Sequence, residues 1–213
     1  WLQYQTYDVT DMLRAGENRL DAWLGNGWYK GRLSWYTGQP DFNEKTDCLY
    51  GDRMQLLCEL HLEFADGAEV VIATDESWKC AESPVLESSI YDGEVYDARL
   101  ESEQPTDKAV PAEAPAAPLS ERLSPPVRVT NHVSAKKLIH TPKDEWVIDF
   151  GQEMTGWVEF DCDLPEGASV TLEFGELLQR GNFYRANLRT AKARFTYISG
   201  GKPAHVRPHF TFY

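Results

Sequence analysis

The run MQLLCELHLEF at residues 54–64 decides the fold class, because apolar side chains occupy every second position in it. The side chains that share its apolar face are Met54, Leu56, Cys58, Leu60, Leu62 and Phe64. The opposite face is polar apart from Leu57. A period of two is typical of a β-strand with one face on a core and the other in water. The turn at 65–67 and the run EVVIAT at 69–74 then predict a β-hairpin.

Short β-rich runs recur on both sides of this hairpin, and no long helix is predicted. The further predicted strands are residues 2–7, 20–24, 127–133, 146–150, 157–161, 169–174, 194–198 and 205–212. Residues 7–13 predict a short helical turn, with Asp8 or Thr10 at its start. This spacing of strands and turns predicts an all-β chain made of two antiparallel, jelly-roll-like β-sandwiches.

A proline-rich segment divides the chain of 213 residues. Half of the twelve prolines lie between Pro105 and Pro126, where large apolar side chains are nearly absent. Proline cannot donate to a sheet, and mixed Pro and Ala favour an extended backbone. We therefore expect one domain at residues 1–105, a linker at 106–125 and a second domain at 126–213. The chain begins and ends inside strand patterns, so we expect a piece of a longer protein whose second domain is truncated at its C-terminus.

The charge balance excludes some partners. The chain has 21 basic and 34 acidic residues, a net charge of −13, and no basic cluster. Nucleic acids and anionic membranes are therefore not expected partners, whereas a cation such as calcium or a neutral ligand is compatible. A membrane span is not expected, because no apolar run approaches the roughly 18–20 residues that a bilayer requires.

The four cysteines contain no CxxC pair, which favours reduced structural thiols over a zinc site or a disulfide framework. The sequence also lacks an N-x-Ser/Thr glycosylation motif. Together these features predict a cytoplasmic location.

Known catalytic motifs are absent from the sequence. It contains no HExxH, GxSxG, P-loop, EF-hand loop or zinc ribbon. The glycines at 25, 27 and 31 read GxGxxxG, which favours a tight turn over a dinucleotide loop. The histidines are scattered, and we expect His61 to face solvent and His205 and His209 to be ordinary sheet residues.

Residues 23–42 hold six aromatic side chains among four glycines. They are Trp23, Trp28, Tyr29, Trp35, Tyr36 and Phe42. An indole face beside polar donors such as Asn26 and Arg32 suits a sugar, because its C–H face stacks on the ring while its hydroxyls form hydrogen bonds. The alternative is that Trp23 and Trp28 fill the core and the others pack against a neighbouring domain.

Residues 87–107 hold seven acidic residues against the single base Arg99. Such density is typical of a solvated loop, a hard-cation site or a surface that recognises hydroxyls. Asp92 and Glu94 lie one residue apart, so on a strand they would share a face and chelate rather than flank a bond. Arg99 is placed to pair with Asp97.

Eight motifs in order give the chain a family resemblance. They are YDVTDMLRAGEN, LGNGWYKGR, YGDRMQLLCELHLEFADG, TDESWK, ESSIYDGEVYDAR, PPVRVT, VIDFGQEMTGWVEF and HFTFY. This series closely resembles the N-terminal non-catalytic region of bacterial α-L-rhamnosidases of glycoside hydrolase family 78. The resemblance extends over nearly the whole chain.

The resemblance implies a large multidomain glycosidase that removes terminal α-L-rhamnose from glycosides with inversion. In that family the acid and base carboxylates lie on an (α/α)6 barrel downstream of β-sandwich domains. Inversion requires two carboxyl groups about 6.5–9.5 Å apart, and we assign no catalytic residue to this chain. The expected partners are a rhamnose-containing glycoside and the catalytic barrel of the same polypeptide.

The resemblance also implies a calcium-assisted rhamnose-binding module within residues 1–105. By motif position the candidate carbohydrate-binding residues are Asn26, Trp28, Asp92, Glu94 and Asp97, with calcium near Asp92 and Glu94. The loop at about 33–47 is longer than the family pattern. We therefore expect a scaffold that braces the barrel, with an independent rhamnose-binding module as the alternative. A free-standing enzyme using Asp92 and Glu94 is the least favoured reading.

Overall fold

The computed structural model describes residues 2–32, 48, 50–101, 104–114 and 116–213. Within these ranges the regular structure consists mainly of short β-strands, and the α-helix, α1 (Gly27–Lys30), has four residues. The 3-10 helices are η1 (Thr10–Met12), η2 (Ala98–Leu100) and η3 (Ala186–Leu188). The expectation of an all-β chain is confirmed, and η1 forms at the predicted helical turn.

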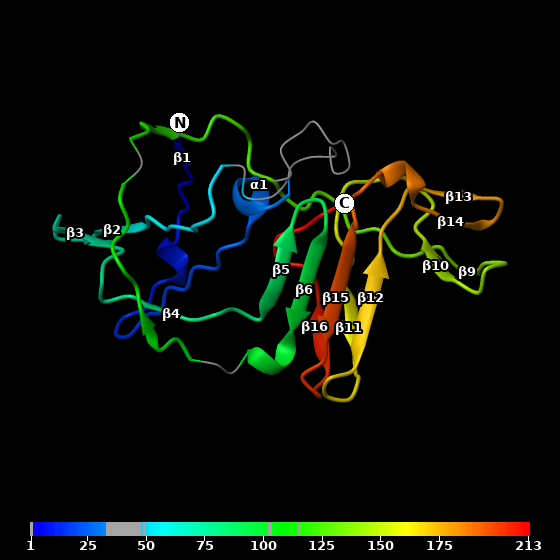
Figure 1. The fold of residues 1–213 in the computed structure, drawn as a ribbon. Helices are drawn as coiled ribbons and strands as arrows, with labels where there is room; N and C mark the ends of the chain where they lie inside the picture. The colour runs from blue at the N-terminus through cyan, green and yellow to red at the C-terminus, as the bar shows by residue number, and fades with distance from the viewer. Residues whose placement is uncertain (1, 33–47, 49, 102–103, 115) are drawn as a thin grey trace.

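A four-stranded sheet with the order β12-β15-β6-β5 lies at the centre of the fold (Figure 1). Its strands are β5 (Val85–Ser89), β6 (Gly93–Asp97), β12 (Ser169–Glu173) and β15 (Arg194–Ile198). The β5–β6 and β12–β15 pairs are antiparallel, but β6 runs parallel to β15, with Val95 opposite Thr196. This pair departs from the expected antiparallel pattern, because parallel neighbours need a long connection and these strands are far apart in the sequence.

The same sheet unites the two predicted halves of the chain. Strands β5 and β6 precede the proline-rich segment, whereas β12 and β15 follow it. That segment contains β7 (Asp107–Lys108) and β8 (Leu119–Glu121), which pair with β4 (Lys79–Cys80) and β1 (Leu2–Tyr4). The domain boundary at residues 106–125 stays a prediction. The central sheet, however, contains strands from both sides of this boundary.

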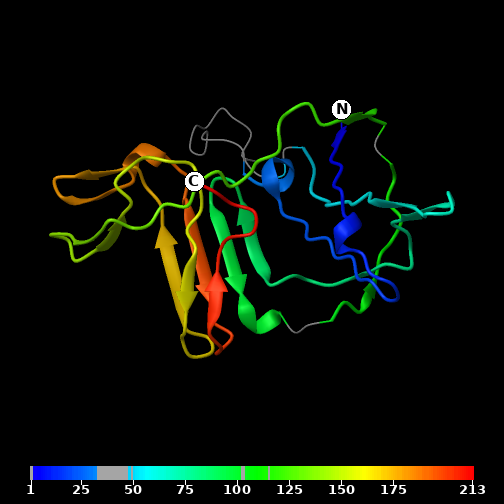
Figure 2. The same cartoon turned by 180° about the vertical axis from the view of Figure 1, so that it is seen from behind.

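A second layer packs on this sheet and creates the core. It is the antiparallel pair β11 (Phe160–Cys162) and β16 (Ala204–Val206), seen in front of the sheet in Figure 2. The buried cluster between the layers contains Tyr96, Cys162, Phe195, Tyr197 and Val206. Alternate residues of β15 enter this core, since Phe195 and Tyr197 share one face of the strand. The result is a small β-sandwich.

Two-stranded hairpins surround the sandwich. The predicted hairpin is present as β2 (Glu59–Glu63) and β3 (Glu69–Ala73), with Leu60 opposite Ile72. It projects at one end of the molecule in Figure 1. At the other end lie β9 (Lys137–His140) with β10 (Trp146–Asp149), and β13 (Leu177–Gln179) with β14 (Asn182–Tyr184).

Several strand predictions differ from the structure, since the 54–64 and 157–161 runs form strands only over Glu59–Glu63 and from Phe160 onward. Residues 20–24 and 127–133 form no strand, and the last predicted strand ends at Val206. Alternating polarity predicts a strand only where a neighbouring strand supplies hydrogen bonds. After Val206 the backbone N–H groups of His209 and Phe210 bond to a side chain instead of a ladder.

No helix in the described part of the chain is long and apolar enough to cross a membrane.

Candidate functional site

The candidate site lies where α1 meets the turn before β6. Asn26 precedes α1, and its side chain makes no capping hydrogen bond. Trp28 lies on α1 with its ring edge-on to Tyr91, at a centroid distance of 5.5 Å, and is 46% exposed. An accessible indole on this short helix is one element that the sugar hypothesis requires.

Arg32 joins the end of this turn to the sheet. Its Nη2 and Nε donate to Asp92 Oδ1 and Oδ2 at 2.7 and 3.3 Å. Its Nη1 donates to Thr190 Oγ1 at 2.8 Å, and the guanidinium lies 5.5 Å from the ring centre of Tyr91. Both charged side chains are largely buried, which makes this bidentate pair stronger than a surface ion pair.

Glu94 is completely buried and accepts four hydrogen bonds from one short segment. The backbone N–H of His209 donates to both carboxylate oxygens at 3.0 and 2.8 Å, and that of Phe210 donates to Oε2 at 2.9 Å. Nδ1 of the His209 ring lies 2.9 Å from Oε1. A buried carboxylate persists only with such partners, so Glu94 is an internal anchor with both oxygens occupied.

The His209 ring packs against two aromatic side chains, Trp23 and Tyr96, whose own centroids lie 6.5 Å apart. Its centroid lies 5.0 Å from that of Trp23 and 4.8 Å from that of Tyr96. Tyr96 stacks in turn on Tyr197, at 6.0 Å. Burial raises the pKa of the Tyr96 hydroxyl, and a hydrogen bond to Glu101 raises it further.

The Asp97 side chain caps the start of η2. Its Oδ1 accepts from the backbone N–H and Nε of Arg99 at 3.1 and 2.9 Å, and its Oδ2 accepts from Nη2 at 2.6 Å. These bonds from Arg99 hold the pKa of Asp97 below its usual range. The predicted Arg99–Asp97 pair is confirmed.

The predicted residues therefore form two groups and not one site. Trp28 and Asp92 meet through Tyr91 and Arg32, whereas Glu94 and Asp97 are buried along β6. The expectation that Asp92 and Glu94 share a strand face is wrong, because Asp92 lies in the turn and the positive φ of Gly93, +104°, interrupts the alternation. Sugar contacts by these residues stay a prediction.

The donor set near Asp92 and Glu94 does not fit calcium in this arrangement. No group of three or more His, Cys, Asp or Glu side chains gathers closely enough to hold a metal in the described ranges. A guanidinium already neutralises Asp92, and N–H donors surround both oxygens of Glu94. Calcium needs six to eight oxygen ligands, and these two carboxylates do not supply them.

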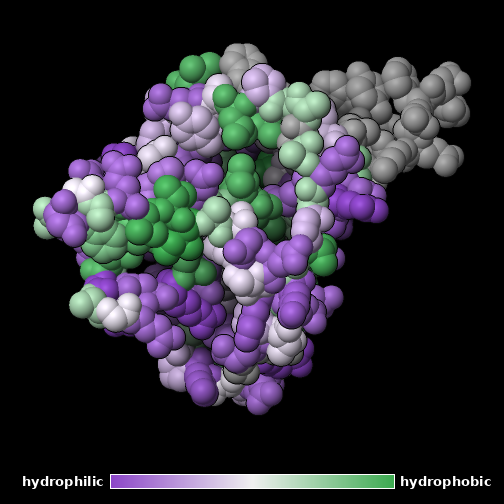
Figure 3. All heavy atoms as spheres, turned by 90° about the vertical axis from the view of Figure 1, so that its left-hand side faces the viewer, coloured by the Kyte–Doolittle hydropathy of each residue, from purple (hydrophilic) through white to green (hydrophobic). Residues whose placement is uncertain are grey.

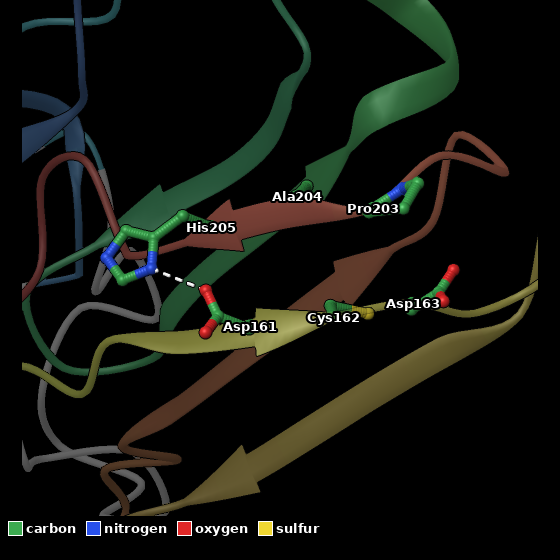
Figure 4. A pocket seen from close by; sticks show the side chains of 6 residues that line it. All are labelled: Asp161, Cys162, Asp163, Pro203, Ala204 and His205. Atoms are coloured by element: carbon green, nitrogen blue, oxygen red, sulfur yellow. Dashed lines mark hydrogen bonds and ion pairs between the residues drawn. The ribbon is translucent and has the colours of Figure 1, made fainter.

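A second feature is an open pocket of about 320 Å³ on the β11–β16 pair (Figure 4). His205 and Asp161 point toward one another from the two strands, with Nδ1 and Oδ1 2.9 Å apart. Glu159 Oε2 lies 3.7 Å from the other ring nitrogen. The hydrogen bond with Asp161 is the largest cause of a raised pKa at His205. Alternation along β11 indicates which face Asp161 occupies, but no local pattern indicates that His205 lies opposite it.

Sequence reasoning missed the role of His209. It lies 115 residues from Glu94, and no local pattern links the two. The glycine at position 25 is consistent with the close packing of the C-terminal segment, since a Cβ there would lie 2.7 Å from the ring of Phe210.

Apolar side chains are exposed beyond the sandwich. The face in Figure 3 carries hydrophobic side chains over the end of the molecule that contains the β2–β3 hairpin. On this hairpin the exposed side chains of Val70 and Ile72 lie on the same face as Leu62 and Leu60, their partners across the two strands. We call this set the hairpin patch. Monomeric proteins rarely leave such patches uncovered.

Comparisons with known proteins point to one family. Residues 1–131 match the model of the alpha-L-rhamnosidase N-terminal domain, and residues 139–213 match the bacterial alpha-L-rhamnosidase concanavalin-like domain. An alpha-L-rhamnosidase of Streptomyces avermitilis is 33% identical over the whole chain, which spans 21% of that protein. One from Alteromonas is 31% identical, and the chain spans 24% of it.

Solved structures agree with these matches. The native α-L-rhamnosidase of Aspergillus terreus superposes with a TM-score of 0.85 and 29% identity, over 99% of this chain and 25% of that one. The Streptomyces avermitilis α-L-rhamnosidase in complex with L-rhamnose gives a TM-score of 0.83 and 32% identity, over 99% of this chain and 21% of that one. The chain thus spans between a fifth and a quarter of the length of these relatives.

Proposed function

This chain belongs to the α-L-rhamnosidase family, and we propose that it is the non-catalytic N-terminal scaffold of a glycosidase that hydrolyses terminal α-L-rhamnosides. Its relatives are four to five times as long. In this proposal the catalytic carboxylates belong to the remainder of the parent enzyme, an (α/α)6 barrel, and the present region braces that barrel.

The observation that carries the proposal is the amount of surface left uncovered. The accessible surface is 16576 Å² for a chain of 24.2 kDa, whereas a compact monomer of that mass exposes about 10,000 Å². The hairpin patch contributes apolar area to this excess. An apolar surface of this kind is stable when another part of the same polypeptide covers it.

The environment of the candidate carboxylates supports a non-catalytic role. Asp92 is neutralised by Arg32, Glu94 is buried against backbone donors, and Asp97 is bound to Arg99. A general acid or base must reach a substrate proton. None of these three is placed to do so.

Hydrolysis of a chromogenic aryl α-L-rhamnoside tests whether the chain is catalytic. We expect residues 1–213 to give no turnover above the uncatalysed rate. Turnover by the purified chain that disappears in Asp92→Asn would contradict the proposal, because it would place the reaction within this region.

The bracing role is tested in the full-length parent enzyme. We expect Ile72→Asp in the hairpin patch to lower the thermal midpoint of the parent, because a charge would then face the surface that covers the patch. Glu63→Gln in the same hairpin is the matched control. A parent whose midpoint and activity are unaffected by Ile72→Asp would contradict bracing through this patch.

A second candidate function is an independent rhamnose-binding module. The exposed ring of Trp28, next to an Asn26 side chain that makes no capping hydrogen bond to α1, favours it. A rhamnose titration monitored by tryptophan fluorescence, with and without calcium, separates it from the scaffold. We expect any signal to be lost in Trp28→Phe, and a flat titration up to about 10 mM removes this candidate, since weaker binding is below about 3 kcal/mol.

A further inference from the structure

We infer that Asp92 and Glu94 are positioning residues that clamp the α1 turn onto the central sheet from both of its ends. The two carboxylates are separated in the sequence by Gly93 alone, yet they bind different segments. This inference goes beyond the scaffold proposal and requires no ligand.

The first arm of the clamp follows α1. Arg32 lies two residues after Lys30, the last residue of α1, and bonds Asp92 through two nitrogens. It also donates to the backbone carbonyl of Thr190 at 2.5 Å and to the Thr190 hydroxyl. The guanidinium therefore fastens the end of the turn to the loop before β15 and to the turn before β6.

The second arm precedes α1 and passes through the C-terminal segment. Glu94 fixes the backbone of His209 and Phe210, and this holds the His209 ring against Trp23. Phe210 packs at Gly25, where a side chain would collide with its ring. Residues 23–25 are thereby pressed against β6 by a segment that Glu94 anchors.

The two arms together determine where Trp28 lies. The helix between them has only four residues, too few to be stable by its own hydrogen bonds. Its orientation therefore depends on the contacts at its two ends. Trp28 additionally touches Tyr91, the residue before Asp92.

Hydrogen exchange measured by mass spectrometry tests the clamp in the 213-residue chain. Glu94→Gln replaces an acceptor-only carboxylate by a group with two N–H donors that face the backbone donors of the C-terminal segment. We expect exchange in residues 23–32 and 207–213 to accelerate about ten- to hundredfold, the effect of losing charge-assisted hydrogen bonds. Exchange in β12 should stay unchanged.

Asp92→Asn tests the other arm, and Glu87→Gln is the matched control. Asp92→Asn should accelerate residues 27–32 more than 207–213. Glu87 lies exposed on β5 of the same sheet. Glu87→Gln removes one negative charge, as Asp92→Asn and Glu94→Gln do, but it should leave hydrogen exchange at the wild-type rate. Uniform acceleration over the whole chain, or wild-type exchange in residues 23–32 of both test variants, would overturn the inference.

A spectroscopic measurement covers the case in which Glu94→Gln does not fold. His209→Ala keeps the backbone bonds to Glu94 but removes the ring that packs against both Trp23 and Tyr96. With 5-fluorotryptophan incorporated, the ¹⁹F resonances of Trp23 and Trp28, assigned through their Phe variants, should both move in His209→Ala. Movement of neither resonance would overturn the second arm.

The clamp and the rhamnose-binding candidate can fail separately. If rhamnose binds at Trp28, Glu94→Gln should weaken it although Glu94 is too buried to touch the sugar. If a rhamnose titration of the wild-type chain is flat, rhamnose binding is excluded. The clamp is then still tested by the hydrogen-exchange pattern of the variants.

Discussion

Gly93 has a backbone φ of +104°, and its Cα faces the carbonyl oxygen of Arg194 and the hydroxyl of Tyr213. This conformation is strained for any residue with a side chain, and here there is also no room for one. The close approach allows β6 to start its parallel pairing with β15 at this residue.

We predict that Gly93→Ala destabilises the chain by more than about 2 kcal/mol, because both the positive φ and the collision with Arg194 oppose a Cβ. Urea unfolding measures the change in the free energy of unfolding. Gly156→Ala is a suitable control, since its Cβ would meet nothing within 4 Å. Equal stability of the two variants would contradict the packing at the start of β6.

His205 gives a pH prediction at the same scale. Its pKa is raised above 6.5 in the folded chain, chiefly by Asp161. A raised folded pKa means that the His205–Asp161 interaction stabilises the fold fully below the unfolded value of about 6.5 and is lost as pH rises through the folded value. NMR titration should report a lower pKa for His205 in Asp161→Asn. An unchanged value would show that the pair is not formed in solution.

Among the elements, β15 carries the packing of the sandwich. It is flanked by β12 and β6, and its Phe195 side chain is fully buried. The core cluster is small, so each of its members has a large share of the stability.

We predict that Phe195→Ala lowers the free energy of unfolding by about 3–5 kcal/mol, the range for removing a buried aromatic side chain. Thr196→Ala on the opposite face is the matched control, because its hydroxyl only contacts that of Thr171 at the surface. Denaturant unfolding of both variants measures the difference. Similar losses in the two would contradict the position of the core.

The β2–β3 hairpin shows the opposite situation. Every residue of β3 is exposed, including Val70, Val71 and Ile72. A two-stranded hairpin alone is marginally stable in water and needs a third strand or a covering surface. In the proposed parent enzyme the covering surface is the remainder of the polypeptide.

At the scale of the whole molecule, we predict that the isolated chain binds the dye 1-anilinonaphthalene-8-sulfonate with a strong fluorescence increase, because its apolar surface is uncovered. Ile72→Ser should reduce the signal, whereas Ser77→Ala, at an exposed polar site near the same hairpin, should not. Absence of dye binding by the wild-type chain would contradict an open hairpin patch.

The local elements of the fold were predictable where a strand and its partner are close in sequence. The 54–64 pattern and its turn predicted the β2–β3 hairpin, and Asp97 was paired with Arg99 two residues away. Both depend on near neighbours, whose geometry is determined by backbone periodicity. Residues 20–24 have the same polarity pattern but no strand partner, so their pattern was misleading.

The candidate site was predicted only in part. The sequence drew attention to Trp28, Asp92 and Glu94, and the structure places Trp28 and Asp92 around Tyr91 and Arg32. No sequence pattern indicated that Glu94 would contact His209, because the two residues are 115 positions apart. Pairing over such distances depends on how the sheet orders its strands.

By itself the sequence determined the all-β class, the family and the local turns, since alternation, turn residues and ordered motifs are properties of short stretches. Only the tertiary structure decided that β6 lies parallel to β15 and that Glu94 receives the C-terminal segment. Burial is the physical reason. In the sequence alone Glu94 is a candidate ligand-binding carboxylate, but in the fold distant segments enclose it and supply its hydrogen bonds, so it stabilises the C-terminal segment instead.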